Sequence, residues 1–316
     1  MKPGMLLLGN EPVGEVALSK MEQAYTVILK VEGEQEDNSI KNIWIDLSVK
    51  IDEAFFQRFP RVETIVCCAT GSTNINHHVL RERGVELFNL KPHANFLKEI
   101  PATAEHAWAL LMAIHSRIVE ASESVREGKW DKRNFQRHQL KGMHLGIVGY
   151  GRLGRLVGSY GSAFGMKISF SDLLSVNDKV NENHNQIELE ELIKSSDYVV
   201  LTSSVSPGHE EILDSIILDS VKQGLSLVNV SRGLLVDEQK VLELLERDRL
   251  NMYAADVVRL EDISTSQDAS LHTFNQLSRH PRVILTPHMG GYCSDARASC
   301  ENHLIDFLIE GVCPCQ

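Results

Sequence analysis

Three side chains in the second half of the sequence follow short apolar runs. Together they suit chemistry on a carboxylic acid that also carries a carbonyl group. They are Arg232 in NVSRG, Glu261 in DVVRLED and His288 in TPHMGG. An arginine is always charged, and its planar fork can hold a carboxylate and polarise a carbonyl. A histidine titrates near neutrality, and a neighbouring glutamate raises its pKa and orients it. The set predicts a site in which an acid is bound, polarised and protonated.

Each of these residues also has a purely structural interpretation. Arg232 would be a surface arginine closing a turn, Glu261 a solvated loop carboxylate, and His288 a polar residue at the end of a buried strand. Their order is known from the sequence, but their distances are not. We favour catalysis because all three follow strands of one expected sheet, and ligands bind at the carboxyl ends of parallel strands in doubly wound folds.

A glycine-rich turn precedes these residues in LGIVGYGRLG. Gly149, Gly151 and Gly154 have the spacing G-x-G-x-x-G, after an apolar strand and at the start of a helical pattern. Such glycines allow a tight turn, close approach of the backbone to a pyrophosphate, and close packing of helix on strand. The helix N-terminus offers N–H groups and the positive end of its dipole to phosphates. A structural glycine turn is the alternative.

Asp172 distinguishes between two forms of a dinucleotide cofactor. It ends the next strand, KISFSD, 18 residues beyond the last glycine, which is the expected place for a carboxylate that accepts a hydrogen bond from the adenosine ribose 2′-hydroxyl. The carboxylate would repel a 2′-phosphate, and Leu173, Leu174 and Ser175 supply no cation to hold one. We therefore predict NAD(H) rather than NADP(H).

Apolar runs alternate with helical patterns along the chain, which predicts an α/β fold. The expected strands are MLLLG, YTVILKV, NIWIDL, ETIVCCAT and VELFNL before residue 101, and HLGIVG, KISFSD, DYVVLT, LSLVNV, MYAADV and RVILT after it. Nearly continuous apolar strands separated by helices indicate parallel sheets covered on both faces. We predict two doubly wound units, one long helix over PATAEHAWALLMAIHSRIVEASESVREG, and a surface loop over residues 175–186.

Composition excludes several classes of protein. The net charge of −11 argues against a nucleic-acid surface, and no run of eighteen apolar residues could cross a membrane. The N-terminal stretch does not read as a secretory signal, so we expect a cytoplasmic protein. Six scattered cysteines are too sparse for a disulfide scaffold, and the pair Cys313 and Cys315 lacks partners at zinc-site spacing, so we predict no metal.

The ordered motifs resemble those of the D-isomer-specific 2-hydroxyacid dehydrogenase family along nearly the whole chain. LGIVGYGRLG is similar to its cofactor fingerprint, LEELIKSSDYVVLTSSVSP to its second signature, and LVNVSRGLLVDEQKVLELL to its third. The resemblance implies a Rossmann NAD-binding domain, a flavodoxin-like substrate domain, and hydride transfer between nicotinamide and C2 of a small 2-hydroxy or 2-oxo acid. It also implies that Arg232 binds and polarises substrate, that His288 is the acid and base, and that Glu261 supports His288.

The resemblance extends to the remaining contacts. ATGSTNIN is similar to the loop whose N–H groups hold the substrate carboxylate, so Thr70, Gly71 and Ser72 are substrate candidates, with Lys50 as a further one. The residues expected at the cofactor are Gly149, Gly151, Arg152, Leu153, Gly154, Asp172, Ser203, Val230, Ser231, Asp256 and Gly290.

The family's chain path implies discontinuous domains. Residues 1–97 and 292–316 would form the substrate domain, and residues 98–291 the NAD-binding domain. The helix near 101–120 is expected to form a homodimer, and DARASCENHLIDFLIEG to pack on the first domain.

The sequence departs from the family pattern in three places, one of which is the insert EDISTSQDASLHTFNQLSRH, which makes the span from Glu261 to His288 longer than the family leads us to expect. Residues 201–204 read LTSS where L-H-x-P is usual, and Asp262 stands where a proline normally follows the glutamate. Glu261 argues against the formate dehydrogenases, which carry glutamine there. D-3-phosphoglycerate dehydrogenase is an alternative activity, although Lys50 is the only cation in DLSVK to hold a phosphate. A non-catalytic NAD(H)-sensing scaffold is the second alternative.

Overall fold

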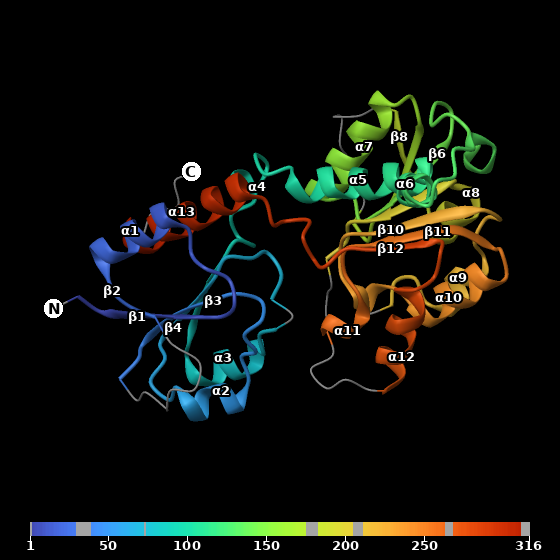
Figure 1. Ribbon diagram of the computed structural model, residues 1–316. Coiled ribbons are helices and arrows are strands. Elements are labelled where there is room, and N and C mark those ends of the chain that lie inside the picture. Colours follow the sequence, from blue (N-terminus) through green and yellow to red (C-terminus); the bar gives the residue numbers. More distant parts are fainter. Residues whose placement is uncertain are drawn as a thin grey trace. The chain divides into compact units, whose positions relative to one another are not determined.

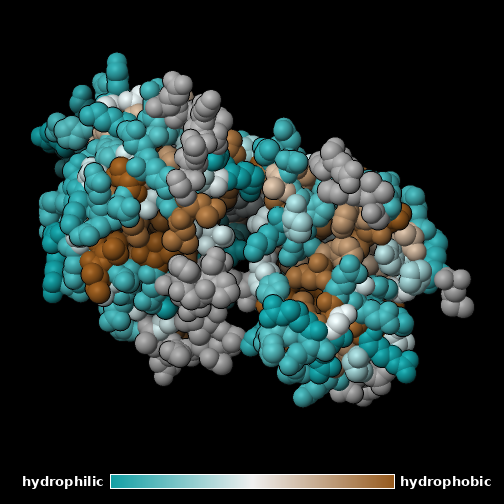
Figure 2. Space-filling view, turned by 180° about the vertical axis from the view of Figure 1, so that it is seen from behind, coloured by the Kyte–Doolittle hydropathy of each residue, from teal (hydrophilic) through white to brown (hydrophobic). Residues whose placement is uncertain are grey.

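The chain divides into two compact units in the computed structural model, which describes residues 2–29, 39–72, 74–174, 183–204, 211–262 and 268–310. One unit comprises Met1–Ile100 with Tyr292–Gln316, and the other comprises Pro101–Gly291 (Figure 1). On the face seen in Figure 2, hydrophilic residues predominate on each unit, and apolar residues gather in patches among them. Within the described ranges no helix is long and apolar enough to cross a membrane.

The first unit is built on a five-stranded parallel sheet with the order β2-β1-β3-β4-β5. Its strands are β1 (Gly4–Leu8), β2 (Thr26–Leu29), β3 (Asn42–Ile45), β4 (Thr64–Cys67) and β5 (Glu86–Asn89). This is the strand order of the flavodoxin-like folds. The α/β class and the doubly wound parallel sheet predicted for this part of the chain are confirmed.

Helices bury apolar residues against both faces of this sheet. They are α1 (Glu15–Ala24), α2 (Glu53–Arg58), α3 (His77–Arg83), α4 (Ala94–Leu97) and α13 (Ser294–Glu310). Phe55 of α2 and Leu80 of α3 belong to one core cluster. Met21 of α1 and Leu304 of α13 belong to the other, so the last helix completes the core of the first unit.

The second unit contains a seven-stranded parallel sheet with the order β12-β11-β10-β9-β6-β7-β8. Its strands are β6 (His144–Val148), β7 (Lys167–Ser171), β8 (His184–Gln186), β9 (Tyr198–Leu201), β10 (Leu225–Asn229), β11 (Leu250–Ala255) and β12 (Val283–Leu285). Counted from β6, this is the Rossmann order 3-2-1-4-5-6 with one strand added. Every residue of β9 and β10 is buried, as expected for strands covered on both faces.

The helices of the second unit also form two layers. The elements are α5 (Ala102–Ser116), α6 (Ile118–Arg126), η1 (Lys132–Phe135), α7 (Arg152–Ala163), α8 (Leu189–Ser195), α9 (Ser215–Asp219), η2 (Gly233–Leu235), α10 (Glu238–Glu246), α11 (Arg259–Asp262) and α12 (Asp268–Leu277). Trp108 of α5 and Val157 of α7 lie in one core cluster. Leu192 of α8 and Leu245 of α10 lie in the other.

Two sequence-based predictions in this unit are wrong. The single long helix is two helices, because Arg117 adopts a left-handed conformation (φ 50°) that ends α5. Its guanidinium donates to the Asn134 carbonyl and lies over the Phe135 ring, contacts that stabilise this uncommon backbone. The loop expected over residues 175–186 ends in an edge strand, β8, whose polar residues carry no strand pattern; residues 175–182 lie outside the described chain.

The register of the second sheet places the ends of six strands in one row. Val148 lies opposite both Ser171 and Leu201, and Asn229 lies opposite Leu201 and Ala255. Leu285, opposite Ala255, completes the row. The side chains that follow these strands must therefore meet along one edge of the sheet.

Candidate active site

The three fingerprint glycines differ in the space around them. A Cβ on Gly149 (φ 87°) would lie 2.5 Å from the Ser203 Cα, and one on Gly154 would lie 2.2 Å from the Gly149 carbonyl oxygen. A Cβ on Gly151, which precedes α7, would meet nothing within 4 Å. The first and third glycines therefore permit a tight turn and close packing, whereas the second leaves a cradle beside a helix N-terminus where a pyrophosphate fits.

Asp172 lies directly beside this turn. Its carboxylate accepts hydrogen bonds from the backbone N–H groups of Tyr150 (2.7 Å) and Leu174 (3.0 Å). The Thr202 hydroxyl donates to the Gly149 carbonyl (2.6 Å), which ties the loop after β9 to the loop after β6. A fixed carboxylate next to an open glycine turn is the arrangement that suits an adenosine ribose and a pyrophosphate, so the residues present fit NAD.

Arg232 is held at the end of β10 by its neighbours. The Asn229 amide accepts from the Ser231 N–H and donates to the Arg232 carbonyl, each over 3.0 Å. The Arg232 guanidinium donates to the Ser231 carbonyl (2.7 Å), and its side chain remains partly exposed. A Cβ on Gly233 would lie 2.1 Å from the carbonyl carbon of Val258, so glycine is needed here for the loop after β11 to pack against Arg232's turn.

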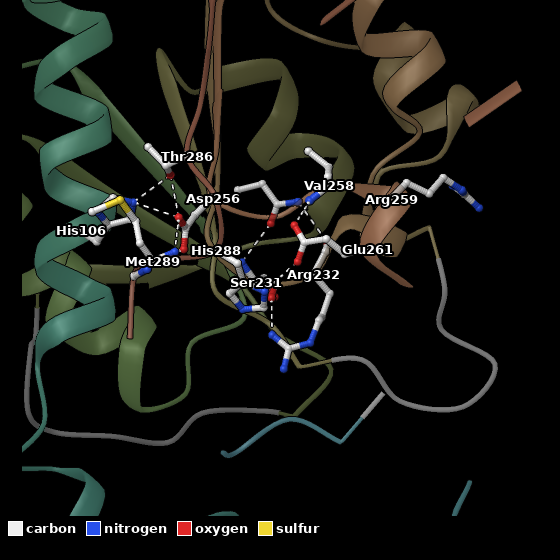
Figure 3. Close-up of polar contacts among 12 residues, drawn as sticks. His106, Ser231, Arg232, Asp256, Val258, Arg259, Glu261, Thr286, His288 and Met289 are labelled. Atoms are coloured by element: carbon white, nitrogen blue, oxygen red, sulfur yellow. Dashed lines mark hydrogen bonds and ion pairs between the residues drawn. The ribbon is translucent and has the colours of Figure 1, made fainter. Parts of the chain in front are cut away.

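His288 and Glu261 form an ion pair, with 2.7 Å between Nδ1 and Oε2 (Figure 3). The other Glu261 oxygen accepts from the Val258 N–H (3.1 Å), which fixes the carboxylate at the start of α11. The hydrogen bond that His288 Nδ1 donates to Glu261 raises the pKa of His288, and burial and the nearby Arg232 partly oppose that rise. Each side chain is 36% exposed, so the imidazole is both oriented and reachable.

Asp256 is buried, and its hydrogen bonds hold the turn that carries His288. Its carboxylate accepts from the Thr286 hydroxyl (2.6 Å) and from the N–H groups of Met289 (2.9 Å) and Gly290 (2.7 Å). Its carbonyl accepts from the His288 N–H (2.9 Å). A Cβ on Gly290 would lie 2.9 Å from the Asp256 carboxylate, so this glycine is required for packing as well as for the predicted approach of a cofactor.

The remaining predicted cofactor residues line the same edge of the sheet. Leu153 packs against the core, Val230 and Ser231 are buried, and the Ser231 hydroxyl donates to the Ser203 carbonyl. Arg152 is the first residue of α7.

The predicted substrate loop belongs to the first unit, where it follows β4. Within the described ranges, the N–H groups of Thr70, Gly71 and Ser72 have no acceptor, so they can hold a carboxylate. The Ser72 hydroxyl lies 2.8 Å from the His77 ring nitrogen. Lys50 is exposed and pairs with Asp52 (3.3 Å), which caps α2.

Some residues that shape the site were not among those predicted from the sequence. Gly233 is the clearest, because a glycine after the arginine of a strand-to-helix turn is itself a sign of close backbone approach. Glu238 is buried and accepts from the Arg259 N–H (3.0 Å), and Thr286 contacts Asp256 as described. His106 lies on α5, far from this site in the sequence, and no motif connects it with Arg232, Glu261 or His288. Among the described residues no cluster of histidine, cysteine, aspartate and glutamate could hold a metal ion, and Cys313 and Cys315 lie outside them.

The chain belongs to the D-isomer-specific 2-hydroxyacid dehydrogenase family. Residues 108–290 match the model described as "D-isomer specific 2-hydroxyacid dehydrogenase, NAD binding domain". This match confirms the family inferred from the sequence and the assignment of NAD(H) to the second unit.

Curated relatives include several named oxidoreductases. A glyoxylate reductase of Thermococcus onnurineus is 30% identical over 259 residues, which cover 79% of this chain and 73% of the relative. A hydroxypyruvate reductase of Blautia hydrogenotrophica is 27% identical, covering 80% of this chain and 78% of the relative. A D-3-phosphoglycerate dehydrogenase of Bacillus subtilis is 27% identical over 84% of this chain, which spans only 48% of that protein.

Solved structures share the fold of the whole chain. A D-lactate dehydrogenase of Aquifex aeolicus, complexed with NAD and lactic acid, has a TM-score of 0.85 at 20% identity and covers 98% of this chain and 96% of its own. A glyoxylate reductase of Paecilomyes thermophila has a TM-score of 0.83 at 21% identity, with coverages of 98% and 95%. These likenesses confirm the fold class of two α/β domains.

Proposed function

We propose that this protein is an NAD-dependent D-2-hydroxyacid dehydrogenase acting on a small 2-hydroxy or 2-oxo acid. The observation that carries the proposal is the ion pair of His288 with Glu261 at the same sheet edge as the open glycine turn. NADH supplies the hydride when it is bound. The residues of the chain supply the binding, polarisation and proton transfer that the reaction also needs.

Each of the three polar residues has one task in the proposed reduction. The Arg232 guanidinium binds the acid and polarises its carbonyl, because its charge is permanent and its side chain is partly exposed. His288 donates a proton to the carbonyl oxygen as negative charge develops there, and it accepts that proton in the reverse direction. Glu261 keeps Nδ1 protonated through its 2.7 Å contact, so the other ring nitrogen is the one that exchanges the proton.

The first unit supports an acidic, unphosphorylated substrate. Thr70, Gly71 and Ser72 offer N–H groups that suit one carboxylate. The cation in the segment after β3 is Lys50, and it already pairs with Asp52 (3.3 Å). This pairing leaves Lys50 less suited to hold a phosphate, which disfavours a phosphorylated acid and with it the alternative of a D-3-phosphoglycerate dehydrogenase.

A panel of 2-oxo acids tests the proposal. Glyoxylate, hydroxypyruvate, pyruvate, bulkier 2-oxo acids and 3-phosphohydroxypyruvate are each mixed with NADH, and absorbance loss is followed. We expect reduction of one of the small unphosphorylated acids, and loss of turnover with retained NADH binding in His288→Ala. NADH binding without reduction of any acid would favour a nucleotide-sensing scaffold instead, and preferential reduction of 3-phosphohydroxypyruvate would favour the phosphoglycerate enzyme.

We further propose that the second unit forms a homodimer. Ile118 (54%), Val119 (44%) and Val125 (49%) of α6 and the nearby Trp130 (89%) are unusually exposed apolar side chains. Light scattering should give twice the chain mass, and Trp130→Glu should shift it toward the monomer. Ile216→Glu, which changes another exposed apolar residue (76%) on α9, is the control and should leave the mass unchanged.

A reducing compartment such as the cytoplasm suits the cysteines of the described residues. Cys67, Cys68, Cys293 and Cys300 are all free thiols, although Cys68 and Cys300 are hydrogen-bonded to each other.

A further inference from the structure

His106, on α5, contacts the catalytic turn from a helix that contributes no residue to the proposed chemistry. Its Nε2 lies 3.0 Å from the Thr286 hydroxyl and 3.2 Å from the Asp256 carboxylate, and its side chain is only 15% exposed. Figure 3 shows His106, Thr286 and Asp256 grouped on one side of His288, with Glu261 and Arg232 on the other. We propose that His106 is a positioning residue that holds the turn from Thr286 to Gly290 and thereby sets the orientation of His288. This inference rests on the proposed function of that site.

The hydrogen bonds define which atom carries each proton. The Thr286 hydroxyl has a single proton, which it donates to Asp256 Oδ1 over 2.6 Å. Its oxygen can then only accept, so His106 Nε2 must be the donor. Asp256 Oδ1 also accepts from the Met289 N–H (2.9 Å), and His106 Nε2 lies 3.2 Å away. With the Thr286 hydroxyl, these groups occupy the hydrogen-bonding capacity of that oxygen. Oδ2 accepts from the Gly290 N–H (2.7 Å) and keeps capacity for one more donor.

The turn needs such support because His288 has a left-handed backbone, with φ at 51°. A residue with a Cβ reaches that conformation at a cost, and the surrounding contacts must hold it there. The His288 N–H donates to the carbonyls of Asp256 (2.9 Å) and Thr286 (3.0 Å), so both residues that His106 contacts also hold the His288 backbone. Removing His106 therefore loosens the two anchors of the catalytic histidine.

The shape around Gly290 supports the same assignment. A Cβ there would lie 2.9 Å from the Asp256 carboxylate and 3.3 Å from the His106 ring. The imidazole thus packs against the turn as well as bonding to it. Among the residues that the structure describes, the charged and titratable groups that face His288 are Glu261, Arg232 and Asp256, and the carboxylate of Asp256 also faces His106.

The test follows the titration of the His288 imidazole by NMR, in native protein and in variants, with the signal assigned by its loss in His288→Asn. In His106→Ala and Thr286→Val the weakened turn should reduce contact with Glu261, so His288 should titrate at a lower pH than in the native protein. His106→Gln keeps an N–H donor at a similar reach and should restore the native titration. In turnover assays we expect about a tenfold loss of kcat/KM in His106→Ala, the effect of one lost hydrogen bond.

His115→Ala is the matched control. His115 is a buried histidine of the same helix, and it bonds to the Tyr198 hydroxyl (2.8 Å) rather than to the turn. Its loss should lower the unfolding temperature without moving the His288 titration. The proposal is overturned if His106→Ala and Thr286→Val leave that titration unchanged, or if His115→Ala moves it equally. Because the NMR readout needs no turnover, failure of the panel of 2-oxo acids would remove the proposed function without deciding this point.

Discussion

Glu261→Gln isolates the charge behind His288, the proposed catalytic histidine. The amide has nearly the same shape as the carboxylate and can still accept from the Val258 N–H, so the start of α11 should be preserved. What disappears is the negative charge 2.7 Å from His288 Nδ1. That charge raises the pKa of His288, and its removal should lower it.

The expected size follows from the geometry of the pair. A charge-assisted hydrogen bond is worth about 1.5–3 kcal/mol, and because both side chains are 36% exposed we discount this for solvent screening to about 1–2 kcal/mol. In the proposed mechanism, reduction requires a protonated His288, so kcat/KM should fall about tenfold at about pH 8. The fall in kcat/KM should be smaller at about pH 5, where the imidazole stays protonated in both proteins.

Full pH profiles in both directions check the reasoning. In reduction the alkaline limb should move to lower pH, since His288 loses its proton earlier. In oxidation His288 acts as the base, so the acid limb should also move to lower pH. Glu190→Gln, which removes the carboxylate of an exposed ion pair with Lys194, should move neither limb. Unmoved limbs in Glu261→Gln, with a uniform loss of rate at every pH, would refute the electrostatic role.

Three further predictions follow from the glycines and the ribose carboxylate. Gly151→Ala, whose Cβ meets only open space, should keep its unfolding temperature but bind NADH more weakly. Gly149→Ala should lose stability as well, because its φ is 87° and its Cβ would lie 2.5 Å from the Ser203 Cα. Thermal unfolding with and without NADH tests both variants. Gly233→Ala places a Cβ 2.1 Å from the Val258 carbonyl carbon and should destabilise the protein by about 1–3 kcal/mol in denaturant unfolding. Asp172→Ser should narrow the preference for NADH over NADPH, because it removes the carboxylate that repels a 2′-phosphate; comparison of kcat/KM with the two cofactors tests this.

Much of this architecture could be predicted from local sequence. Strands such as YVVL and LSLVN are continuous apolar runs, because both faces of a parallel sheet are covered, and their pattern identifies them without tertiary information. The fingerprint glycines are similarly readable, since their spacing reflects the local turn. Arg232, Glu261 and His288 each follow an apolar run, which predicted that they lie at one edge of one sheet. The register of β10, β11 and β12 explains why these strands end at the same edge.

The rest depends on contacts between residues far apart in the chain. His106 and Thr286 meet only because α5 packs against the sheet, and no local pattern marks a histidine that will bond across that distance. The break at Arg117 is similar, because an arginine enters the left-handed region only with help from Asn134 and Phe135. The edge strand β8 takes its conformation from pairing with β7 rather than from its own polar residues.

The return of α13 to the first unit has a consequence for how the protein is made on the ribosome. Met21 and other residues of β1–β5 and their helices emerge early, but Leu304 and Ile305, which cover the same cluster, are synthesised only after the entire second unit. The second unit has all its elements by Gly291 and can fold first, while the face of the first sheet that α1 covers still lacks α13. Slow translation between Gly291 and Glu310 should therefore prolong the exposure of an apolar surface to chaperones and to aggregation.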